Sequence, residues 1–158
     1  MKYLFVISFI ITYACFGNEI GYTSTSPLWT HFTYMFQHSG IAHLIINSVA
    51  FISLFEALSR QINKYRIAIY SVTIAFLASF LPGAAFDIPT VGASAMVYAM
   101  IGMYISVLFR VRVDKKKFAL YLLIIATCLM VSYFKQNSNF WIHLYALVLG
   151  FILHKLKH

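Results

Sequence analysis

TVGASAMVYAMIGM, the stretch from Thr90 to Met103, places one serine hydroxyl, Ser94, near the start of a long apolar run. The residues before it, 81–89, contain two prolines, a glycine and an aspartate, which is typical of a loop. We therefore expect a membrane-spanning helix over 90–109, with Ser94 about one turn inside it. Because serine often hydrogen-bonds to the backbone in membrane helices, this stretch alone indicates packing more than catalysis.

The composition is that of an integral membrane protein. Of 158 residues, 61% are hydrophobic and 10% are charged, and the mean hydropathy is +0.81. A soluble domain of this length cannot bury so much apolar surface. Several of the apolar runs are shorter than the ~20 residues of a lone span, so we expect a compact, all-α bundle forming one domain over 1–158. Six spans are predicted, at about 2–17, 41–58, 67–81, 90–109, 118–134 and 139–154.

The basic residues are distributed very unevenly. Eleven of the twelve Lys and Arg fall on one side of the predicted bundle, and only Lys135 falls on the other. This positive-inside pattern predicts that both termini are cytoplasmic and that loops 18–40, 82–89 and 135–138 face outward. The net charge of +8 is thereby explained by topology and not by nucleic-acid binding. We expect a multi-pass protein of the cell membrane whose surroundings are the lipid bilayer.

Three features receive ordinary explanations. The first run resembles a secretory signal, but no clean small-x-small cleavage site follows, and its removal would leave an odd number of spans. Cys15 and Cys128 lie in different runs without metal-binding spacing, so we expect buried packing residues. Glu56, at the inner end of the second span, is expected to form a structural ion pair.

Polar side chains recur in the outer parts of three spans. Ser94 lies about five residues inside the fourth span, His143 about four inside the sixth and His43 about four inside the second. At ~1.5 Å per residue, all three lie roughly 6 to 8 Å below the outer interface. Asn47, four residues after His43, shares its helical face. An ionisable group facing lipid is costly, so these side chains are expected to meet in the interior. The His43/Asn47 pair alone would indicate a helix–helix hydrogen bond.

This constellation is suited to nucleophilic catalysis. A serine hydroxyl needs an adjacent base, and neutral histidine is the side chain suited to that task, so we predict a Ser94/His143 pair. His43, Asn47 and the Ser94 backbone N–H would stabilise an oxyanion. Tyr98 would stack on the His143 ring and orient it. Small residues that permit close approach of the two helices are Ala95, Ala99 and Gly102 on the fourth span, with Ala146 and Gly150 on the sixth.

Three motifs together resemble the rhomboid family of intramembrane serine proteases. HSGIAHLIIN matches H-x4-H-x3-N at His38, His43 and Asn47. GASAMVYA, which begins at Gly92, resembles the serine motif G-x-S-G-x-x-x-G/A, and IHLYALVLG resembles the motif A-H-x-x-G-x-x-x-G around His143. The motifs occur in the family's order over nearly the whole chain.

The resemblance implies a bacterial-type, minimal six-helix protease. It would use a Ser/His dyad without metal or cofactor and cleave single-span membrane proteins near the outer membrane face. By the same resemblance, Gly92 and His38 would support the site. The chain departs from the pattern at Ala95 and Ala146, where glycine is usual, and also at Ile142, at Thr30 and in its short first outer loop.

Other functions remain open at this stage. A rhomboid-like pseudoprotease would bind membrane helices without cutting them, but such proteins typically lack the serine or the histidine. A small transporter would be favoured by internal repeats or by helix-breaking Gly/Pro pairs inside the spans, and neither is found. A zinc protease is disfavoured because the sequence has no H-E-x-x-H motif. The natural substrate and the oligomeric state do not follow from the sequence.

The charge distribution yields a test of sidedness. A reporter fused after Lys157 should be cytoplasmic, and a cysteine placed at Ser138 should react with a membrane-impermeant reagent from outside, because the basic loops are retained inside. The reverse pattern at both positions would overturn the predicted topology and the common depth of the polar side chains.

Overall fold

The computed structural model describes residues 1–84, 87–135 and 138–155. Within these ranges the regular elements are all helical, as expected. Each apolar run corresponds to one long helix, and two short helical segments lie in the first outer loop. The elements are α1 (Lys2–Cys15), η1 (Asn18–Ile20), α2 (Thr30–Thr33), α3 (Ile41–Ser59), α4 (Lys64–Ala78), α5 (Ser94–Arg110), α6 (Lys115–Phe134) and α7 (Phe140–Lys155). Lys157, used in the sidedness argument, lies outside the described residues, as do parts of the two later outer loops.

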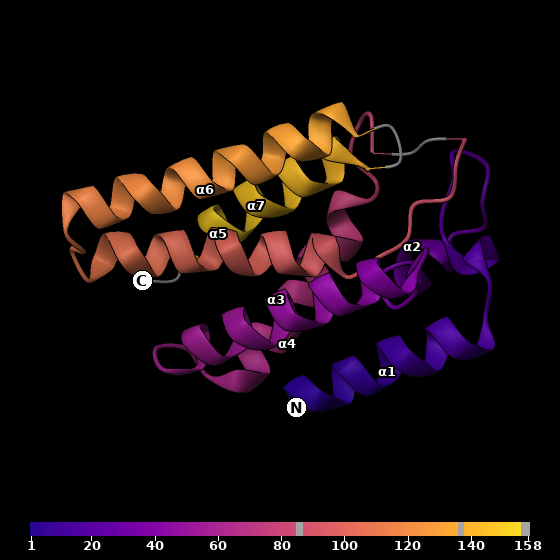
Figure 1. Ribbon diagram of the computed structural model, residues 1–158, viewed down its shortest axis with the longest axis horizontal. Coiled ribbons are helices and arrows are strands. Elements are labelled where there is room, and N and C mark those ends of the chain that lie inside the picture. The colour runs from indigo at the N-terminus through magenta and orange to yellow at the C-terminus, as the bar shows by residue number, and fades with distance from the viewer. Residues whose placement is uncertain (85–86, 136–137, 156–158) are drawn as a thin grey trace.

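The centre of the bundle is α5. It contacts α7 most extensively and also packs on α3 and α4, while α1 packs on α3 and α6 on α7. In Figure 1 the long helices run lengthwise, and the α3–α4 and α5–α6 connections lie toward one end. This arrangement brings the N-terminal ends of α3, α5 and α7 together at the opposite end.

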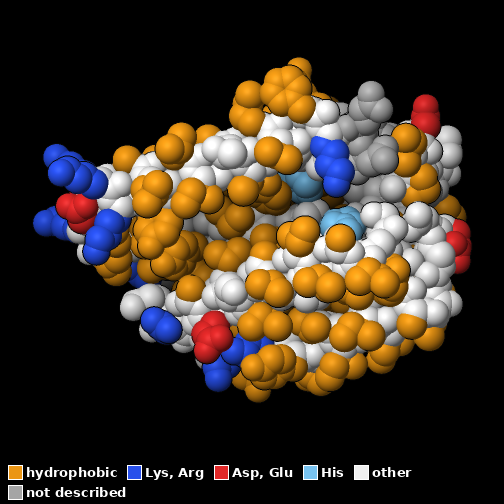
Figure 2. Space-filling model, in the orientation of Figure 1, with side chains coloured by type: hydrophobic (Ala, Val, Ile, Leu, Met, Phe, Trp, Pro, Cys, Tyr) orange, Lys and Arg blue, Asp and Glu red, His pale blue; other side chains and the backbone are white. Residues whose placement is uncertain are grey.

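The outer surface of the bundle suits a membrane. By length and composition, α3 and α6 are long and apolar enough to cross a bilayer, and α1, α5 and α7 are shorter apolar helices. Figure 2 shows hydrophobic side chains along the flanks and most Lys and Arg gathered at one end. The count of six spans and the side on which the termini lie stay predictions.

Two local expectations are decided by the packing. Lys2 Nζ lies 2.9 Å from Glu56 Oε2, which confirms the expected ion pair and ties the start of α1 to α3. The expectation that Cys15 and Cys128 are buried is wrong, because both are exposed free thiols. The physical reason is that lipid is as apolar as a protein interior, so an apolar residue on a membrane helix needs no protein partner.

The start of α5 differs from the expected one. The helix begins at Ser94 and not at Thr90, because the residues before it are held in an extended connection. Thr90 N donates to Tyr22 O at 2.9 Å, and Tyr22 N donates back to Thr90 O at 3.2 Å. Gly92 then adopts φ +126°, a conformation that L side chains rarely adopt. Ser94 is therefore the first residue of its helix.

Small residues allow the backbones of α5 and α7 to touch. A Cβ added at Gly102 would collide with Leu147 O and would lie 2.7 Å from Phe151 N. A Cβ added at Gly150 would collide with Ala99 O in the same way. These atoms belong to the backbone and cannot rotate aside. The small-residue spacing thus corresponds to direct helix–helix contact, which fixes the distance between the two helices.

We expect Gly102→Ala to destabilise the protein by about 1–3 kcal/mol, because the added methyl must push α5 away from α7. The gain in helix propensity, about 1 kcal/mol, offsets only part of this cost. Thermal unfolding in detergent micelles would measure it. The matched control is Ala126→Val on the exposed face of α6, where a change within about 0.5 kcal/mol is expected. Equal stability of both variants and the parent would contradict the close-contact argument.

Candidate active site

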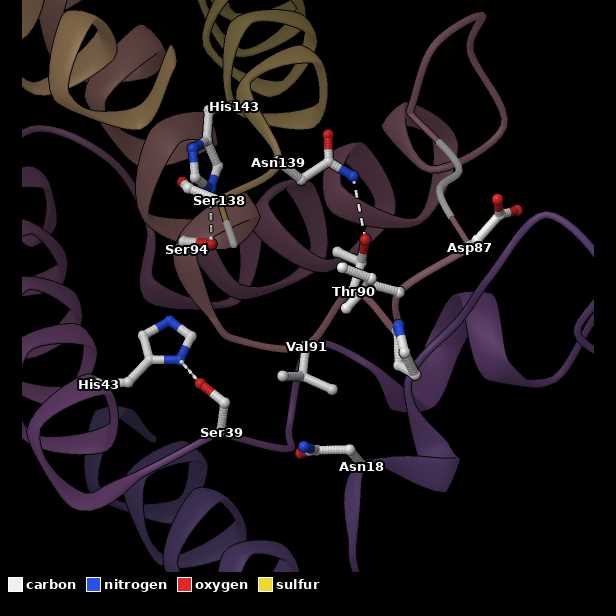
Figure 3. A pocket seen from close by; sticks show the side chains of 12 residues that line it. Asn18, Ser39, His43, Asp87, Thr90, Val91, Ser94, Ser138, Asn139 and His143 are labelled. Atoms are coloured by element: carbon white, nitrogen blue, oxygen red, sulfur yellow. Dashed lines mark hydrogen bonds between the residues drawn. The ribbon is translucent and has the colours of Figure 1, made fainter. Parts of the chain in front are cut away.

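Ser94 and His143 are brought into direct contact. Ser94 Oγ lies 2.8 Å from His143 Nε2, within hydrogen-bond distance (Figure 3). Ser94 is the first residue of α5, and His143 lies in the first turn of α7, so the α5–α7 contact sets their separation. His143 is 7% exposed, whereas Ser94 is only partly buried and faces a cavity.

Tyr98 holds one face of the imidazole. Its ring stacks on His143 with centroids 4.5 Å apart and an interplanar angle of 20°. Tyr98 lies one turn after Ser94 on the same face of α5, so the helix period places the aromatic ring under the histidine. The expected stacking contact is therefore present in the structure.

The second nitrogen of His143 has a partner that the sequence did not indicate. His143 Nδ1 lies 2.8 Å from Ser132 Oγ, on α6, and Ser132 Oγ lies 2.8 Å from Ser138 Oγ. No residue of the fifth predicted span, 118–134, is among the site residues expected from the sequence. The available signal was weak: Ser132 is one of three small polar residues in that span, and nothing in its spacing indicates the orientation toward α7.

Asn139 links the start of α7 to the outer loops. Its Nδ2 donates to Ala84 O at 2.6 Å and to Thr90 Oγ1 at 3.0 Å, and it lies 3.3 Å from the Tyr22 hydroxyl. Its Oδ1 accepts from Ile142 N at 3.2 Å. Burial raises the pKa of Tyr22 well above its ordinary value, against the opposing hydrogen bonds of Thr90 and Asn139. Tyr22 therefore stays a neutral donor to the same carbonyl, Ala84 O, at 2.6 Å.

His43 and Asn47 lie opposite Gly92. A Cβ added at Gly92 would lie 2.7 Å from His43 Cε1 and 3.5 Å from Asn47 Nδ2, so a side chain there would occupy the space in front of both. His43 Nδ1 is held by Ser39 Oγ at 3.1 Å. Among the described residues, the buried Asn47 Nδ2 has no hydrogen-bond partner. A donor that is buried and unpaired is costly, so it marks a position where a ligand atom would be stabilised.

His38 supports the loop before α5. It is 1% exposed, and its Nε2 accepts from Ala93 N at 3.4 Å, while its ring lies 5.2 Å from that of His43. Gly92 N donates to Tyr34 O at 2.9 Å on the other side of the same loop. The structure therefore places His38 behind the connection to Ser94 and not beside the hydroxyl itself.

A cavity of about 470 Å³ opens onto these groups. Figure 3 shows His143 and Ser94 on one side of it and His43 on the other. Asp87 lines the cavity and accepts from Ser24 Oγ at 3.0 Å, and no described hydrogen bond joins it to His143. The lining residues are Asn18, Ser39, His43, Asp87, Ile88, Pro89, Thr90, Val91, Ser94, Ser138, Asn139 and His143.

The arrangement can carry out proton transfer at a nucleophile. An imidazole nitrogen within 2.8 Å of a serine oxygen can take the hydroxyl proton as that oxygen attacks. Within the described part of the chain, no group of three or more His, Cys, Asp or Glu is arranged to hold a metal ion. The groups that meet at the cavity include the Ser94 hydroxyl, the His143 imidazole and the ring of His43.

Comparison with known proteins agrees with the motifs. The Rhomboid domain family model matches residues 25–158 of the chain. A protein of Bacillus subtilis (strain 168), named "Putative rhomboid protease YdcA", is 28% identical over 142 residues, which cover 87% of this chain and 70% of that protein.

Proposed function

Since the chain belongs to the rhomboid family, whose members are membrane proteins, we propose that it is an intramembrane serine endopeptidase with Ser94 as nucleophile and His143 as general base. The observation that carries this proposal is the 2.8 Å contact between Ser94 Oγ and His143 Nε2 at the wall of a polar cavity. A hydroxyl in this position is both activated and accessible.

The reaction follows from the geometry. Ser94 Oγ attacks the scissile carbonyl carbon while its proton passes to His143 Nε2. The tetrahedral intermediate collapses when His143 returns that proton to the leaving amine, which breaks the peptide bond. A water molecule from the cavity then gives a proton to His143 and attacks the acyl ester, releasing the second product and restoring Ser94.

The negative oxygen of the intermediate would be stabilised by donors around Gly92. The first N–H groups of a helix have no partner within it, so the Ser94 N–H at the start of α5 is available. The unpaired Asn47 Nδ2 and the His43 ring lie across from Gly92, and the absence of a side chain there leaves room for the oxygen. These groups are fixed before the substrate arrives, which is the condition for effective electrostatic stabilisation.

The dyad is tested with Ser94→Ala, His143→Ala and the double variant. Each single change should reduce cleavage of a model membrane substrate at least about 10⁴-fold, and the double variant should be no worse, since the two groups act as a unit. Asn47→Ala should retain the dyad and reduce the rate about 100-fold. Labelling of Ser94 by a fluorophosphonate, with thermal unfolding to show that each variant is folded, completes the measurement.

The same two helices offer a matched control. Ser106 Oγ lies 3.0 Å from His154 Nδ1 in a second buried Ser/His pair on α5 and α7, and neither residue lines the cavity at Ser94. Ser106→Ala should therefore leave cleavage and labelling unchanged. Activity of purified Ser94→Ala well above background would place the nucleophile elsewhere. Full binding of membrane helices without labelling or cleavage by the parent protein would favour the pseudoprotease alternative.

We further propose that the substrates are single-span membrane proteins cut near the outer end of their span. Figure 2 shows histidine side chains in a hollow bordered by hydrophobic side chains, which suits a segment arriving from lipid. A stable helix keeps its carbonyls in its own hydrogen-bond ladder, so the segment must unwind before Ser94 can attack. Close packing beside the dyad, where Ala95 and Ala146 are fully buried, favours a small residue just before the cut.

Substrates with Gly-Gly below the candidate site and Ala at it should be cut faster than matched substrates with Leu-Leu and Phe. The reason is that glycine weakens the helix and alanine fits the small space. Rates would be measured with purified protein in liposomes and in detergent. Equal rates for all four combinations in liposomes would refute both the unwinding and the small-residue argument, even with the Ser94 assignment intact.

A further inference from the structure

The buried hydroxyl of Ser132 is unexplained by packing. Ser132 is 5% exposed and is the one buried residue of α6 within the described chain. The rest of that helix faces outward: 6% of its apolar window is buried, against 33% for α3. The most buried side chain of α6 is thus a polar group, whereas Leu129 on the same helix packs only partly buried against the core. The Ser132 hydroxyl contacts His143 Nδ1 at 2.8 Å.

Hydrogen-bond donors and acceptors around His143 can be assigned by elimination. For Ser94 to donate to His143 Nε2, that nitrogen must be unprotonated, and the neutral ring then carries its proton on Nδ1. Ser132 Oγ must accept that proton's hydrogen bond. Its own proton is free to point to Ser138 Oγ, 2.8 Å away, and Ser138 lines the cavity. If Ser94, His143 Nδ1 and Ser132 each donate toward Ser138, every hydrogen bond between Ser94 and the cavity wall at Ser138 is satisfied.

We propose that Ser132, supported by Ser138, is a positioning residue that holds His143 in the tautomer able to accept the Ser94 proton. This inference deepens the proposed function and rests on it. Tyr98 fixes the plane of the ring by stacking, but stacking does not distinguish the two nitrogens. The Ser132 hydroxyl supplies that distinction when it donates its own proton to Ser138 Oγ, because its oxygen then accepts from His143 Nδ1 and favours the form protonated there. When the imidazolium forms during attack, the same oxygen continues to accept from Nδ1.

The position of Ser132 also links α6 to the base. Ring contacts also join α6 to its neighbours, Tyr121 to Tyr104, Phe118 to Phe109 and Tyr133 to Phe140. The distance of α6 from α7 decides whether the acceptor for His143 Nδ1 is present. Displacement of α6 from α7 would remove the Nδ1 partner while leaving the Ser94–His143 contact and the α5–α7 packing in place. The Ser132 hydrogen bond therefore makes the His143 tautomer, and with it the rate, depend on a helix with one buried side chain.

The test uses Ser132→Ala, Ser132→Thr and, as the matched control, Thr127→Val. Thr127 is an exposed α6 hydroxyl that donates to Leu123 O in its own helix, so its loss should affect none of the three readouts. The first readout is the rate of fluorophosphonate labelling of Ser94, and the second is KM for a membrane substrate. The third is the His143 tautomer in ¹⁵N-histidine-labelled protein, with the resonance assigned by comparison with His143→Gln.

We expect Ser132→Ala to slow labelling about three- to tenfold, the effect of one neutral hydrogen bond, with KM unchanged. The His143 signal should change from the Nδ1–H form to a mixture of tautomers, and Ser132→Thr should restore both. If Ser132→Ala is too unstable to measure, Ser138→Ala removes the partner of the Ser132 hydroxyl. It should slow labelling and mix the tautomers in the same way, but to a smaller extent. An unchanged tautomer and labelling rate in the variant would overturn the proposal.

Failure of the proposed function would look different. If the parent protein were not labelled at Ser94 at all, the dyad assignment would fall, yet the tautomer of His143 would still report whether Ser132 sets it. Conversely, normal labelling of a parent protein whose His143 is protonated on Nε2 would support Ser94 as the nucleophile. It would refute the proposal that Ser132 holds His143 in the Nδ1–H form.

Discussion

The backbone contact between α5 and α7 is the constraint on which the rest of the structure depends. Gly102 and Gly150 each face a carbonyl of the other helix at a distance that excludes even a methyl group. Membrane helices gain little from hydrophobic burial against one another, so such close approach is the main source of their packing energy. It also sets the geometry of the candidate site, because Ser94 and His143 lie at the N-terminal ends of these two helices and can meet only if the axes are this close.

The outer loops complete the site by fixing how α5 and α7 begin. Asn139 bonds Ala84 O and Thr90 Oγ1 just before α7, and the Tyr22–Thr90 pairing holds the chain extended just before α5. In water these contacts would contribute little each. In a site close to lipid, a backbone group without a hydrogen-bond partner costs several kcal/mol of folding free energy. The polar loops are therefore structural parts of the site.

The sequence predicted the helices and a common depth for Ser94, His143 and His43, because apolar run length and helical rise determine depth. It also predicted that Asn47 shares the helical face of His43. The catalytic roles of these residues stay predictions. The sequence did not predict Ser132, whose significance depends on the rotation of α6, nor the start of α5 at Ser94, which depends on pairing with Tyr22. It was wrong about Cys15 and Cys128. The Ser132 contact and the start of α5 depend on contacts between residues far apart in the sequence. The exposure of the two cysteines depends on which face of a helix meets lipid. The local spacing of residues does not determine either property.

The two Ser/His pairs on α5 and α7 show what turns such a pair into a site. Ser94/His143 and Ser106/His154 are both at hydrogen-bond distance on the same two helices. Ser106 contacts Nδ1 of His154, whereas Ser94 contacts Nε2 of His143, which leaves Nδ1 of His143 for Ser132. The Ser94/His143 pair also lines a cavity and lies beside the unpaired Asn47 donor, whereas neither Ser106 nor His154 lines that cavity. A hydroxyl beside an imidazole is therefore one way to satisfy buried polar groups, and the proposed catalysis additionally requires room for a carbonyl and a donor for its oxygen.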